Sequence, residues 1–318
     1  MRWLAALAVL IASAAQADDA AMTRLDTAFG TWLDAHDVKG VMAVRHKGVL
    51  LGVIEHGLSA DEPVELASVS KSITGLCALS LVQDGRLDWD DTVSARVGKG
   101  PDVTLAQLLT HSAGLGPDST QMAMFLWRDQ PPHRSADVLD QVLERSEQSA
   151  EVGTFSYNNE NYALIGLMIE EASGAPYAET CTKRVLDPAG AEGGAAAASG
   201  AFMPWGGWAM RVNDYAALHE HWFGRDGVVG ADPFAFPHVE AWDAYYGLGT
   251  MFRQSFDGSG YHFWHFGALC FANDGSIGAY AVSWFGDWSL LAAYDDCILD
   301  DTLIELDNAL ARAGLDLE

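Results

Sequence analysis

The stretch Ser68-Val69-Ser70-Lys71, with the apolar run from Ile73 to Val82 behind it, decides the fold and the chemistry that this sequence predicts. Residues three positions apart share one helix face, so we expect Ser68 and Lys71 to lie close together in the first turn of a helix. The run is apolar on nearly all sides and stops at Asp84-Gly85, which is typical of a helix buried in the centre of a fold. A hydroxyl and an amine at a helix start, where backbone N–H groups favour negative charge, can support acyl transfer.

The composition excludes several classes of protein. A chain of 318 residues with 49% hydrophobic content can bury a large core. The formal net charge of −26 argues against nucleic acid as a partner, because such proteins neutralise phosphates with Lys and Arg. We interpret the acidity as a matter of solubility, with selection for cationic substrates as the alternative. No two cysteines have the spacing of a zinc knuckle, and the sequence predicts neither a metal nor a cofactor.

The first residues have the pattern of a secretory signal peptide. Arg2 is followed by an apolar stretch from Trp3 to Ala12 and by the small-residue site Ala15-Gln16-Ala17. Residues 1–17 are therefore expected to be removed, so that residues 18–318 form a periplasmic or secreted protein. No later apolar segment reaches the roughly 20 residues that span a bilayer, and we expect a monomer without a membrane span.

Four cysteines, Cys77, Cys181, Cys270 and Cys297, would meet an oxidising compartment after export. Three pairings are possible. We favour Cys270 with Cys297, because both fall at strand ends of one predicted meander. Cys77 lies on the apolar run, where an unreactive buried thiol explains it at least as well as a disulfide.

Hydrophobic periodicity and turn residues predict the order of helices and strands. Helices are expected at Met22 to Asp37, Thr104 to Leu109, Ser135 to Arg145, Asn161 to Ala172, Asn213 to Phe223 and Leu299 to Ala313. Strands are expected at Val41 to Arg45, Val49 to Glu55, Tyr261 to Cys270, Ile277 to Phe285 and Trp288 to Tyr294. The small-residue segment from Gly193 to Gly200 is predicted to be a flexible loop.

The predicted fold class is α/β (α+β), an antiparallel sheet flanked by helices with an inserted all-helical lobe. The first hairpin and the last three strands would form the sheet, so the α/β lobe takes about residues 18–85 and 241–318. The helical lobe takes about residues 86–240. Small-molecule sites commonly form in the cleft between two such lobes.

Two further segments contain candidate catalytic residues. Tyr157-Asn158-Asn159 lies in a loop before a predicted helix, where an Asn can equally be an N-cap and the Tyr a half-buried aromatic residue. His265-Phe266-Gly267 lies on the strand that we expect at the sheet edge. A His on an aromatic strand can also be a packed residue with no role in catalysis.

Taken in order, Ser68-x-x-Lys71, Tyr157-x-Asn159 and His265-x-Gly267 resemble the three signatures of the serine β-lactamase and penicillin-binding-protein family. They are most similar to its class C β-lactamase, D-alanyl-D-alanine carboxypeptidase and esterase branch. Other stretches also resemble the family, namely Gly85 to Asp91, Leu108 to Leu115 and Tyr246 to Gly249. The resemblance covers nearly the whole mature chain and implies a β-lactamase/transpeptidase-like fold.

The resemblance also implies roles for these residues. Ser68 would attack a carbonyl carbon and form an acyl-enzyme, with Lys71 and Tyr157 sharing its proton as general bases. The oxyanion hole of the family maps to the backbone N–H groups of Ser68 and Ala268. Asn159 would hydrogen-bond the acyl side chain or help to position Lys71.

The third signature departs from the family pattern in a way that bears on substrate. Most β-lactamases have a Lys followed by a hydroxyl residue there, and these two bind the substrate carboxylate. This chain has His265 and Phe266, so a carboxylate would lose a charge-assisted hydrogen bond worth about 1.5 to 3 kcal/mol. We therefore expect poor β-lactam hydrolysis, while Gly267 would let a substrate backbone approach the strand.

A hydrophobic acyl pocket could come from Trp205, Trp208, Phe263, Trp264 and Phe266, with core packing as the alternative for most of them. The pH optimum stays open at this level. Lys71 can act as a base only if burial lowers its pKa by about 3 units from the free value. A catalytic positive charge on His265 would instead make activity decline around pH 6.5.

Three hypotheses follow. The first is an exported serine hydrolase that acts on a small ester or amide through acyl-Ser68. The second keeps this mechanism for β-lactams or peptidoglycan peptides, as in a β-lactamase or D-alanyl-D-alanine carboxypeptidase. The third is a catalytically inactive binding protein on the same scaffold, which the intact Ser68, Lys71 and Tyr157 argue against.

Overall fold

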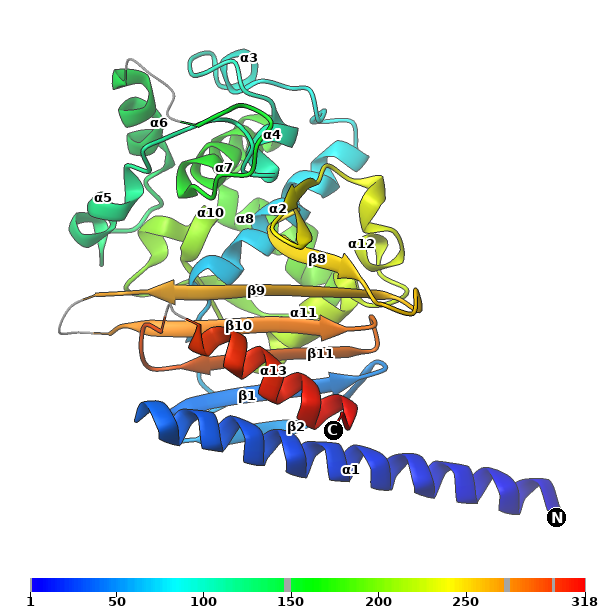
Figure 1. Cartoon of the computed structure of the whole chain (residues 1–318). Helices are drawn as coiled ribbons and strands as arrows, with labels where there is room; N and C mark the ends of the chain where they lie inside the picture. The colour runs from blue at the N-terminus through cyan, green and yellow to red at the C-terminus, as the bar shows by residue number, and fades with distance from the viewer. Residues whose placement is uncertain (1, 146–149, 272–274, 299–300, 318) are drawn as a thin grey trace.

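One large antiparallel sheet lies between two layers of helices (Figure 1). This computed structural model describes residues 2–145, 150–271, 275–298 and 301–317, with side chains described from residue 16 onward. The eight strands follow the order β2-β1-β11-β10-β9-β8-β7-β6. Their bounds are β1 Gly40–His46, β2 Val49–His56, β6 Val239–Ala241, β7 Ala244–Gly247, β8 Thr250–Gln254, β9 Tyr261–Leu269, β10 Ile277–Trp284 and β11 Trp288–Tyr294.

The remaining elements are mostly helical. A small second sheet has the order β3-β5-β4, from Val64–Glu65, Trp208–Met210 and Gly193–Ala195. The α-helices are α1 Arg2–His36, α2 Ser70–Gln83, α3 Val93–Val97, α4 Leu105–Leu109, α5 Thr120–Trp127, α6 Ser135–Glu144, α7 Asn159–Ser173, α8 Tyr177–Cys181, α9 Asp187–Ala189, α10 Met203–Gly206, α11 Val212–Phe223, α12 Val228–Ala231 and α13 Thr302–Leu315. Short turns of other helix types are η1 Ala67–Val69, η2 Thr182–Leu186, η3 Gly200–Phe202 and η4 Pro233–Ala235.

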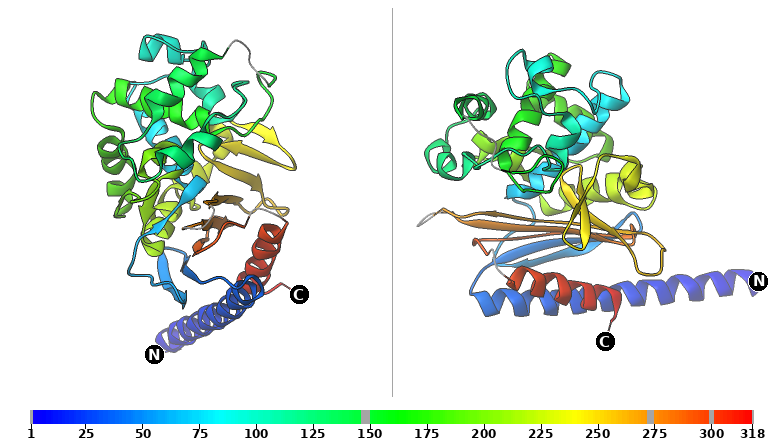
Figure 2. Two further views of the ribbon diagram at one scale, coloured as in Figure 1. Left: turned by 90° about the vertical axis from the view of Figure 1, so that its left-hand side faces the viewer. Right: turned by 45° about the horizontal axis from the view of Figure 1, so that its top comes forward.

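The alternation of side chains along a strand divides the core into two parts. On β1, Val41 and Ala43 face the core that contains α2, whereas Met42 and Val44 face the layer made by α1 and α13. Figure 2 shows these two helices together on the outer face and the other helices gathered on the opposite face. The N-terminal part of α1 projects beyond the sheet (Figure 1). None of the described helices has an apolar stretch long enough to cross a bilayer.

Helix α2 is buried on all sides, as its sequence predicts. Its residues from Ser70 to Leu79 are all buried, and it ends at the predicted Asp84-Gly85. Gly249, at a φ of +82°, packs so closely on α2 that an added Cβ would lie 2.2 Å from the backbone oxygen of Lys71. The loop before β8 therefore fixes the start of the helix against the sheet.

Most predicted elements are confirmed, and the exceptions are informative. Ser68 lies in the 3₁₀ turn η1, just before α2 begins at Ser70, and not in the first turn of the α-helix itself. The predicted loop from Gly193 to Gly200 begins with strand β4, which pairs with β5. Strands β6, β7 and β8 were not predicted from the sequence. Helix α11, assigned to the helical lobe, packs against β1 and β11 of the sheet.

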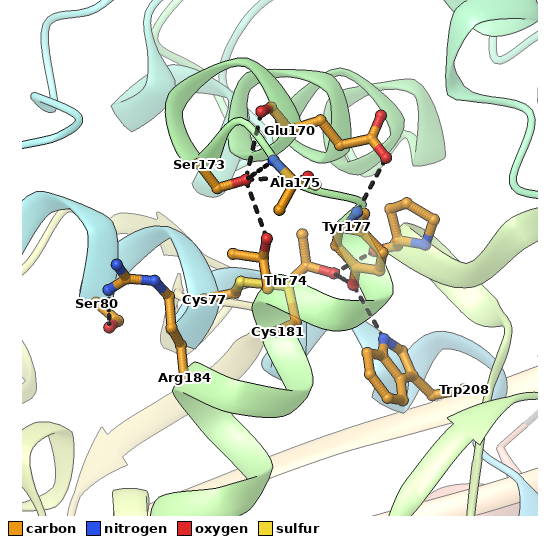
Figure 3. Close-up of a disulfide and its surroundings, with 12 residues drawn as sticks. Thr74, Cys77, Ser80, Glu170, Ser173, Ala175, Tyr177, Cys181, Arg184 and Trp208 are labelled. Atoms are coloured by element: carbon orange, nitrogen blue, oxygen red, sulfur yellow. Dashed lines mark hydrogen bonds between the residues drawn. A yellow bond between two sulfur atoms is a disulfide. The ribbon is translucent and has the colours of Figure 1, made fainter.

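Both cysteine pairs form disulfides, so the expectation of an unreactive thiol at Cys77 is wrong. Cys77 on α2 is bonded to Cys181 on α8 across 104 residues of sequence, as Figure 3 shows. Beside this bond, Thr74 donates a hydrogen bond of 2.6 Å to the backbone oxygen of Pro204. The preferred pairing of Cys270 with Cys297 is confirmed.

Candidate active site

Segments far apart in the sequence meet around Ser68. The turn η1 holds Ser68 directly before α2, and it packs against β9 and β10 of the sheet. Ala67 has a φ of +45°, a conformation that costs a non-glycine residue on the order of 1 kcal/mol or more. The fold therefore holds the nucleophile candidate in a strained turn, as is common at functional sites.

The amine of Lys71 is surrounded by three oxygen atoms. Its Nζ lies 2.8 Å from Oδ1 of Asn159, 2.7 Å from the backbone oxygen of Trp205 and 3.2 Å from Oγ of Ser68. Amide oxygens can only accept, so a neutral amine donates its two N–H groups to Asn159 and Trp205. Its lone pair is then left for the hydroxyl hydrogen of Ser68, which is the geometry of a base beside a nucleophile.

Burial gives Lys71 the proton affinity that this role requires. The side chain is fully buried, and desolvation lowers its pKa to about 7, while the negative charge of Asp118 opposes this shift. This lowering of the pKa is in the direction that a base at position 71 needs. Lys71 can bind and release a proton near neutral pH.

Tyr157 is a second polar side chain at the Ser68 hydroxyl. Its phenol hydrogen-bonds Ser68, and its ring centre is 4.9 Å from Nζ of Lys71. Burial raises the pKa of Tyr157, although 41% of the residue remains exposed. Tyr157 consequently keeps its proton near neutral pH, which favours Lys71 over Tyr157 as the first acceptor.

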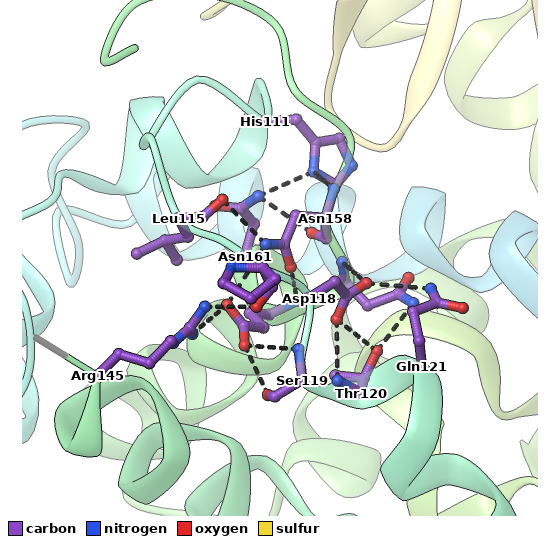
Figure 4. A network of polar contacts seen from close by, with 12 residues as sticks. His111, Leu115, Asp118, Ser119, Thr120, Gln121, Arg145, Asn158 and Asn161 are labelled. Carbon is purple, nitrogen blue, oxygen red and sulfur yellow. Dashed lines mark hydrogen bonds and ion pairs between the residues drawn. The ribbon is translucent and has the colours of Figure 1, made fainter. Parts of the chain in front are cut away.

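A chain of polar groups fixes the amide of Asn159, and Figure 4 labels two of its members, Asp118 and Thr120. Asp118 accepts the hydroxyl of Thr120 at 2.7 Å, and Thr120 Oγ1 accepts Nδ2 of Asn159 at 3.0 Å. Because the Thr120 proton is used by the carboxylate, Thr120 can only accept from Asn159. The amide oxygen of Asn159 is thereby turned toward Lys71. Asp118 also accepts the backbone N–H of Asn159 at 3.1 Å.

A second part of this network supports the loop that carries Tyr157. Asn158 caps α7 by accepting the backbone N–H of Glu160 at 2.8 Å, so the predicted N-cap is present at this position. Nδ1 of the buried His111 accepts the backbone N–H of Asn158 at 3.2 Å. The His111 ring lies 4.4 Å from that of Tyr157, so it packs against the loop that carries Tyr157.

His265 faces Ser68 but carries no positive charge at physiological pH. It is 7% exposed, and desolvation together with the charge of Lys71 lowers its pKa to about 3. Its Nδ1 donates to the backbone oxygen of Phe266 at 2.6 Å, so Nε2 is the acceptor for the Tyr246 hydroxyl at 3.4 Å. The expectation that activity declines near pH 6.5 because His265 loses a proton is therefore wrong.

Alternation along β9 separates the other residues of the third signature. Gly267 faces η1 so closely that an added Cβ would lie 2.9 Å from the backbone nitrogen of Ser68. Phe266 points to the opposite face, where it stacks on Tyr280 with ring centres 4.3 Å apart. The argument that Phe266 replaces a hydroxyl donor facing the substrate is therefore wrong.

The free part of β9 forms one wall of the cleft. β8 pairs with β9 only from Tyr261 to Trp264, so β9 is not the edge strand that was expected. Along residues 265–269, however, the described part of the chain gives β9 no strand partner on that side. Ala268 lies on this free segment, and its role in the oxyanion hole stays a prediction.

The cleft has a volume of about 1360 Å³ and reaches from Ser68 around the free edge of β9 to the face covered by α13. Of the aromatic residues proposed for an acyl pocket, Trp205 lines the cleft beside Ser68. Trp208 and Phe263 are fully buried in the core, as the alternative interpretation holds. Trp264 and Phe266 line the part of the cleft on the outer face of the sheet.

Sequence reasoning missed three groups that act on Lys71, namely the carboxylate of Asp118, the hydroxyl of Thr120 and the backbone oxygen of Trp205. Asp118 lies in a Gly-Pro-Asp-Ser-Thr stretch that has the pattern of a turn followed by a helix start. That pattern predicts a capping carboxylate, and Asp118 does accept the backbone N–H of Thr120 at 3.0 Å. Nothing in the sequence indicates that the carboxylate also reaches Asn159.

Comparison with known proteins agrees with this geometry. The family model described as Beta-lactamase matches residues 22–283, so the chain belongs to the β-lactamase family, whose members include serine hydrolases. The fold is the β-lactamase/transpeptidase fold. The D-stereospecific amidohydrolase from Streptomyces sp. has a TM-score of 0.73 at 18% identity, covering 92% of this chain and 98% of that one. This likeness concerns the fold alone.

Curated relatives match smaller parts of the chain. Protein flp of Staphylococcus aureus (strain NCTC 8325 / PS 47) is 31% identical over 132 residues, which is 39% of this chain and 26% of flp. A penicillin-binding protein of Bacillus subtilis (strain 168) is 28% identical over 179 residues, covering 52% of this chain and 40% of that protein. The match therefore spans less than half the length of either relative.

Proposed function

We propose that the chain is an exported serine hydrolase that cleaves a small ester or amide through an acyl-Ser68 intermediate. The observation that carries the proposal is the coordination of Lys71, whose two amide acceptors leave a lone pair for the Ser68 hydroxyl. Burial that lowers the pKa of Lys71 to about 7 supplies the matching proton affinity. The pattern of residues 1–17 supports export.

In the first step, Oγ of Ser68 bonds to the carbonyl carbon as its proton moves to Nζ of Lys71. The carbonyl oxygen becomes an oxyanion, with the backbone N–H groups of Ser68 and Ala268 as its proposed donors. Collapse of this intermediate expels the leaving group, which takes a proton from the hydroxyl of Tyr157, and Lys71 returns a proton to Tyr157. Water then repeats the sequence on the acyl-enzyme and releases the acid.

The polarity of the cleft supports a neutral substrate group beside Ser68. Among the described lining residues the only Arg or Lys is Arg253, whose guanidinium lies over the ring of Trp264, 5.4 Å from its centre. His265 stays neutral, because its pKa is lowered to about 3. Lys71 must itself be neutral to act as the base, so in the reactive state a substrate carboxylate near Ser68 would leave water without gaining a cationic partner, at a cost of about 1 to 3 kcal/mol.

A fluorophosphonate probe and a chromogenic short-chain ester test the proposal. Wild type should be labelled once per chain and should hydrolyse the ester, whereas Ser68→Ala should do neither. The matched control is Ser70→Ala, because the Ser70 hydroxyl accepts the backbone N–H of Trp208, whereas the described hydrogen-bond partners of the Lys71 amine are Ser68, Asn159 and Trp205. Equal labelling of wild type and Ser68→Ala would refute an acyl-Ser68 mechanism.

Turnover of a β-lactam is the second candidate, supported by the similarity to a penicillin-binding protein. Comparing kcat/KM for nitrocefin, which carries a carboxylate, with that for a neutral ester separates the two candidates. We expect the ester to be preferred by at least tenfold, since a missing charge-assisted hydrogen bond is worth about 1.5 to 3 kcal/mol. Preference for nitrocefin would select the β-lactamase or carboxypeptidase alternative.

A further inference from the structure

Trp242 is an exposed aromatic residue held in an unfavourable backbone conformation at the mouth of the cleft. It lies in the two-residue turn between β6 and β7 and is 82% exposed. Its φ of +56° is typical of glycine in such turns and is rare for a bulky residue. Neither core packing nor turn chemistry accounts for a tryptophan there, which points to a binding role.

Four aromatic rings connect this turn to the nucleophile. The Trp242 ring meets Phe155 edge to face with centres 5.3 Å apart, and Phe155 lies 5.4 Å from Tyr246. Tyr246 lies 6.3 Å from Tyr157, whose hydroxyl contacts Ser68. All four rings line the same cleft as Ser68. An apolar group that starts at the reaction centre can therefore pass Tyr157 and reach Phe155 and Trp242 at the rim, while Tyr246, which is 1% exposed, packs against Phe155 and Tyr157.

We propose that Trp242 and Phe155 form a binding site for the leaving group of the substrate, and that this group is planar and apolar. This inference rests on the proposed function, in which Tyr157 gives its proton to the leaving group. The part of the substrate next to Tyr157 is then the part that continues along the aromatic row. Asp243, beside Trp242 on the same turn, lies 3.6 Å from the guanidinium of Arg253, so the two charges offset each other and the site is selected by its aromatic surface.

Two esters of one acid test the site without changing the acyl group. Benzyl acetate and ethyl acetate have alcohol leaving groups of similar chemistry, but only benzyl alcohol can stack on the row. Wild type should show the lower KM for benzyl acetate. Trp242→Gly should raise that KM by about 2- to 10-fold, the range expected for one aromatic contact, and leave kcat/KM for ethyl acetate unchanged.

The variants are chosen so that loss of folding cannot imitate the result. Glycine accepts the φ of +56°, so Trp242→Gly keeps the turn, and its Tm should match that of wild type. Trp242→Phe should retain most of the preference for the benzyl ester. Equal losses on both esters, or a wild type that does not prefer benzyl acetate, would overturn the inference.

A binding measurement separates failure of the site from failure of the proposed function. The chain has 11 tryptophans, and with 5-fluorotryptophan the ¹⁹F resonance of Trp242 is identified by its absence in Trp242→Phe. Titration with benzyl alcohol, but not with ethanol, should move that resonance even in Ser68→Ala. No movement would overturn the site, whereas movement without any turnover would leave the site standing and refute the hydrolase.

Discussion

At the scale of single residues, the environment of Lys71 explains how a buried amine can act as a base. Its neutral form satisfies two acceptors and still offers a lone pair to Ser68, whereas its protonated form would use a third N–H on the Ser68 oxygen. Deprotonation of Lys71 therefore frees the hydroxyl of Ser68 to be activated. The protonation state of this one amine should control acylation.

The first prediction concerns pH. Lys71 is mostly protonated below its pKa of about 7, so acylation should fall about tenfold for each unit of pH below that value. The rate of fluorophosphonate labelling as a function of pH measures this limb. His265→Gln is the control and should leave the limb in place, because His265 is already neutral. If the limb disappeared in His265→Gln, the titrating group would be His265 and not Lys71, and the prediction would be wrong.

The second prediction concerns Asp118, whose charge raises the pKa of Lys71 against the larger effect of burial. Asp118→Asn should therefore move the acid limb to lower pH, in addition to any loss of rate from the disturbed Asn159 amide. Asp26→Asn removes the same charge from α1, on the far side of the sheet, and should not move the limb. If Asp118→Asn were slower but its acid limb did not move, the charge of Asp118 would not affect the pKa of Lys71, and the role of Asp118 would be structural only.

Ser68 and Lys71 could be found from the sequence, because residues three positions apart lie close together in any helical turn. The orientation of Phe266 could also be found, since alternation from Gly267 places the two on opposite faces of β9. The contact of Asp118 with Asn159 could not, because it joins residues 41 positions apart through side-chain geometry.

At the scale of elements, α2 was predictable and its covalent link was not. An apolar run without a polar face indicates a buried helix, but pairing of Cys77 depends on where α8 packs. Strands β6 to β8 have three to five residues each, too few for their alternation to stand out from the surrounding loops. Packing against neighbouring strands, more than local pattern, defines such short strands.

The third prediction compares the two disulfides. The bond between Cys77 and Cys181 closes 104 residues, and that between Cys270 and Cys297 closes 27. Because a longer loop loses more entropy, replacing Cys77 and Cys181 with Ala should lower the free energy of unfolding by up to about 5 kcal/mol. Urea denaturation should give a smaller loss for the Cys270 and Cys297 double variant. The reverse order would show that loop entropy does not dominate.

At the scale of the whole molecule, the described side chains of α1 attach this helix to the sheet. From Ala21 onward its side chains Leu25 and Phe29 are buried under the sheet, and Asp18 pairs with His46 at 2.9 Å. The buried side chains of the described part of α1 thus lie beyond the predicted cleavage site after Ala17. Cleavage there would leave the contact between α1 and the sheet in place.

The fourth prediction follows from the position of these buried contacts after the predicted cleavage site. Export of the full chain from bacterial cells should yield a protein whose intact mass begins at Asp18. A chain expressed directly as residues 18–318 should unfold at the same temperature as the exported protein, because the buried contacts of α1 are retained. An exported protein that keeps residues 1–17 would contradict the signal peptide.

The pairing of β1 with β11 also sets the order in which the molecule can be assembled on the ribosome. Residues 40–46 cannot pair with residues 288–294 until the latter have been synthesised, so the middle of the sheet cannot form earlier. The hairpin of β1 and β2 can pair early, but nearly all of the polypeptide must be synthesised before β1 can pair with β11, and such distant pairing is slow. A chain that terminates before residue 288 would leave β1 with one open strand edge, which is prone to aggregate.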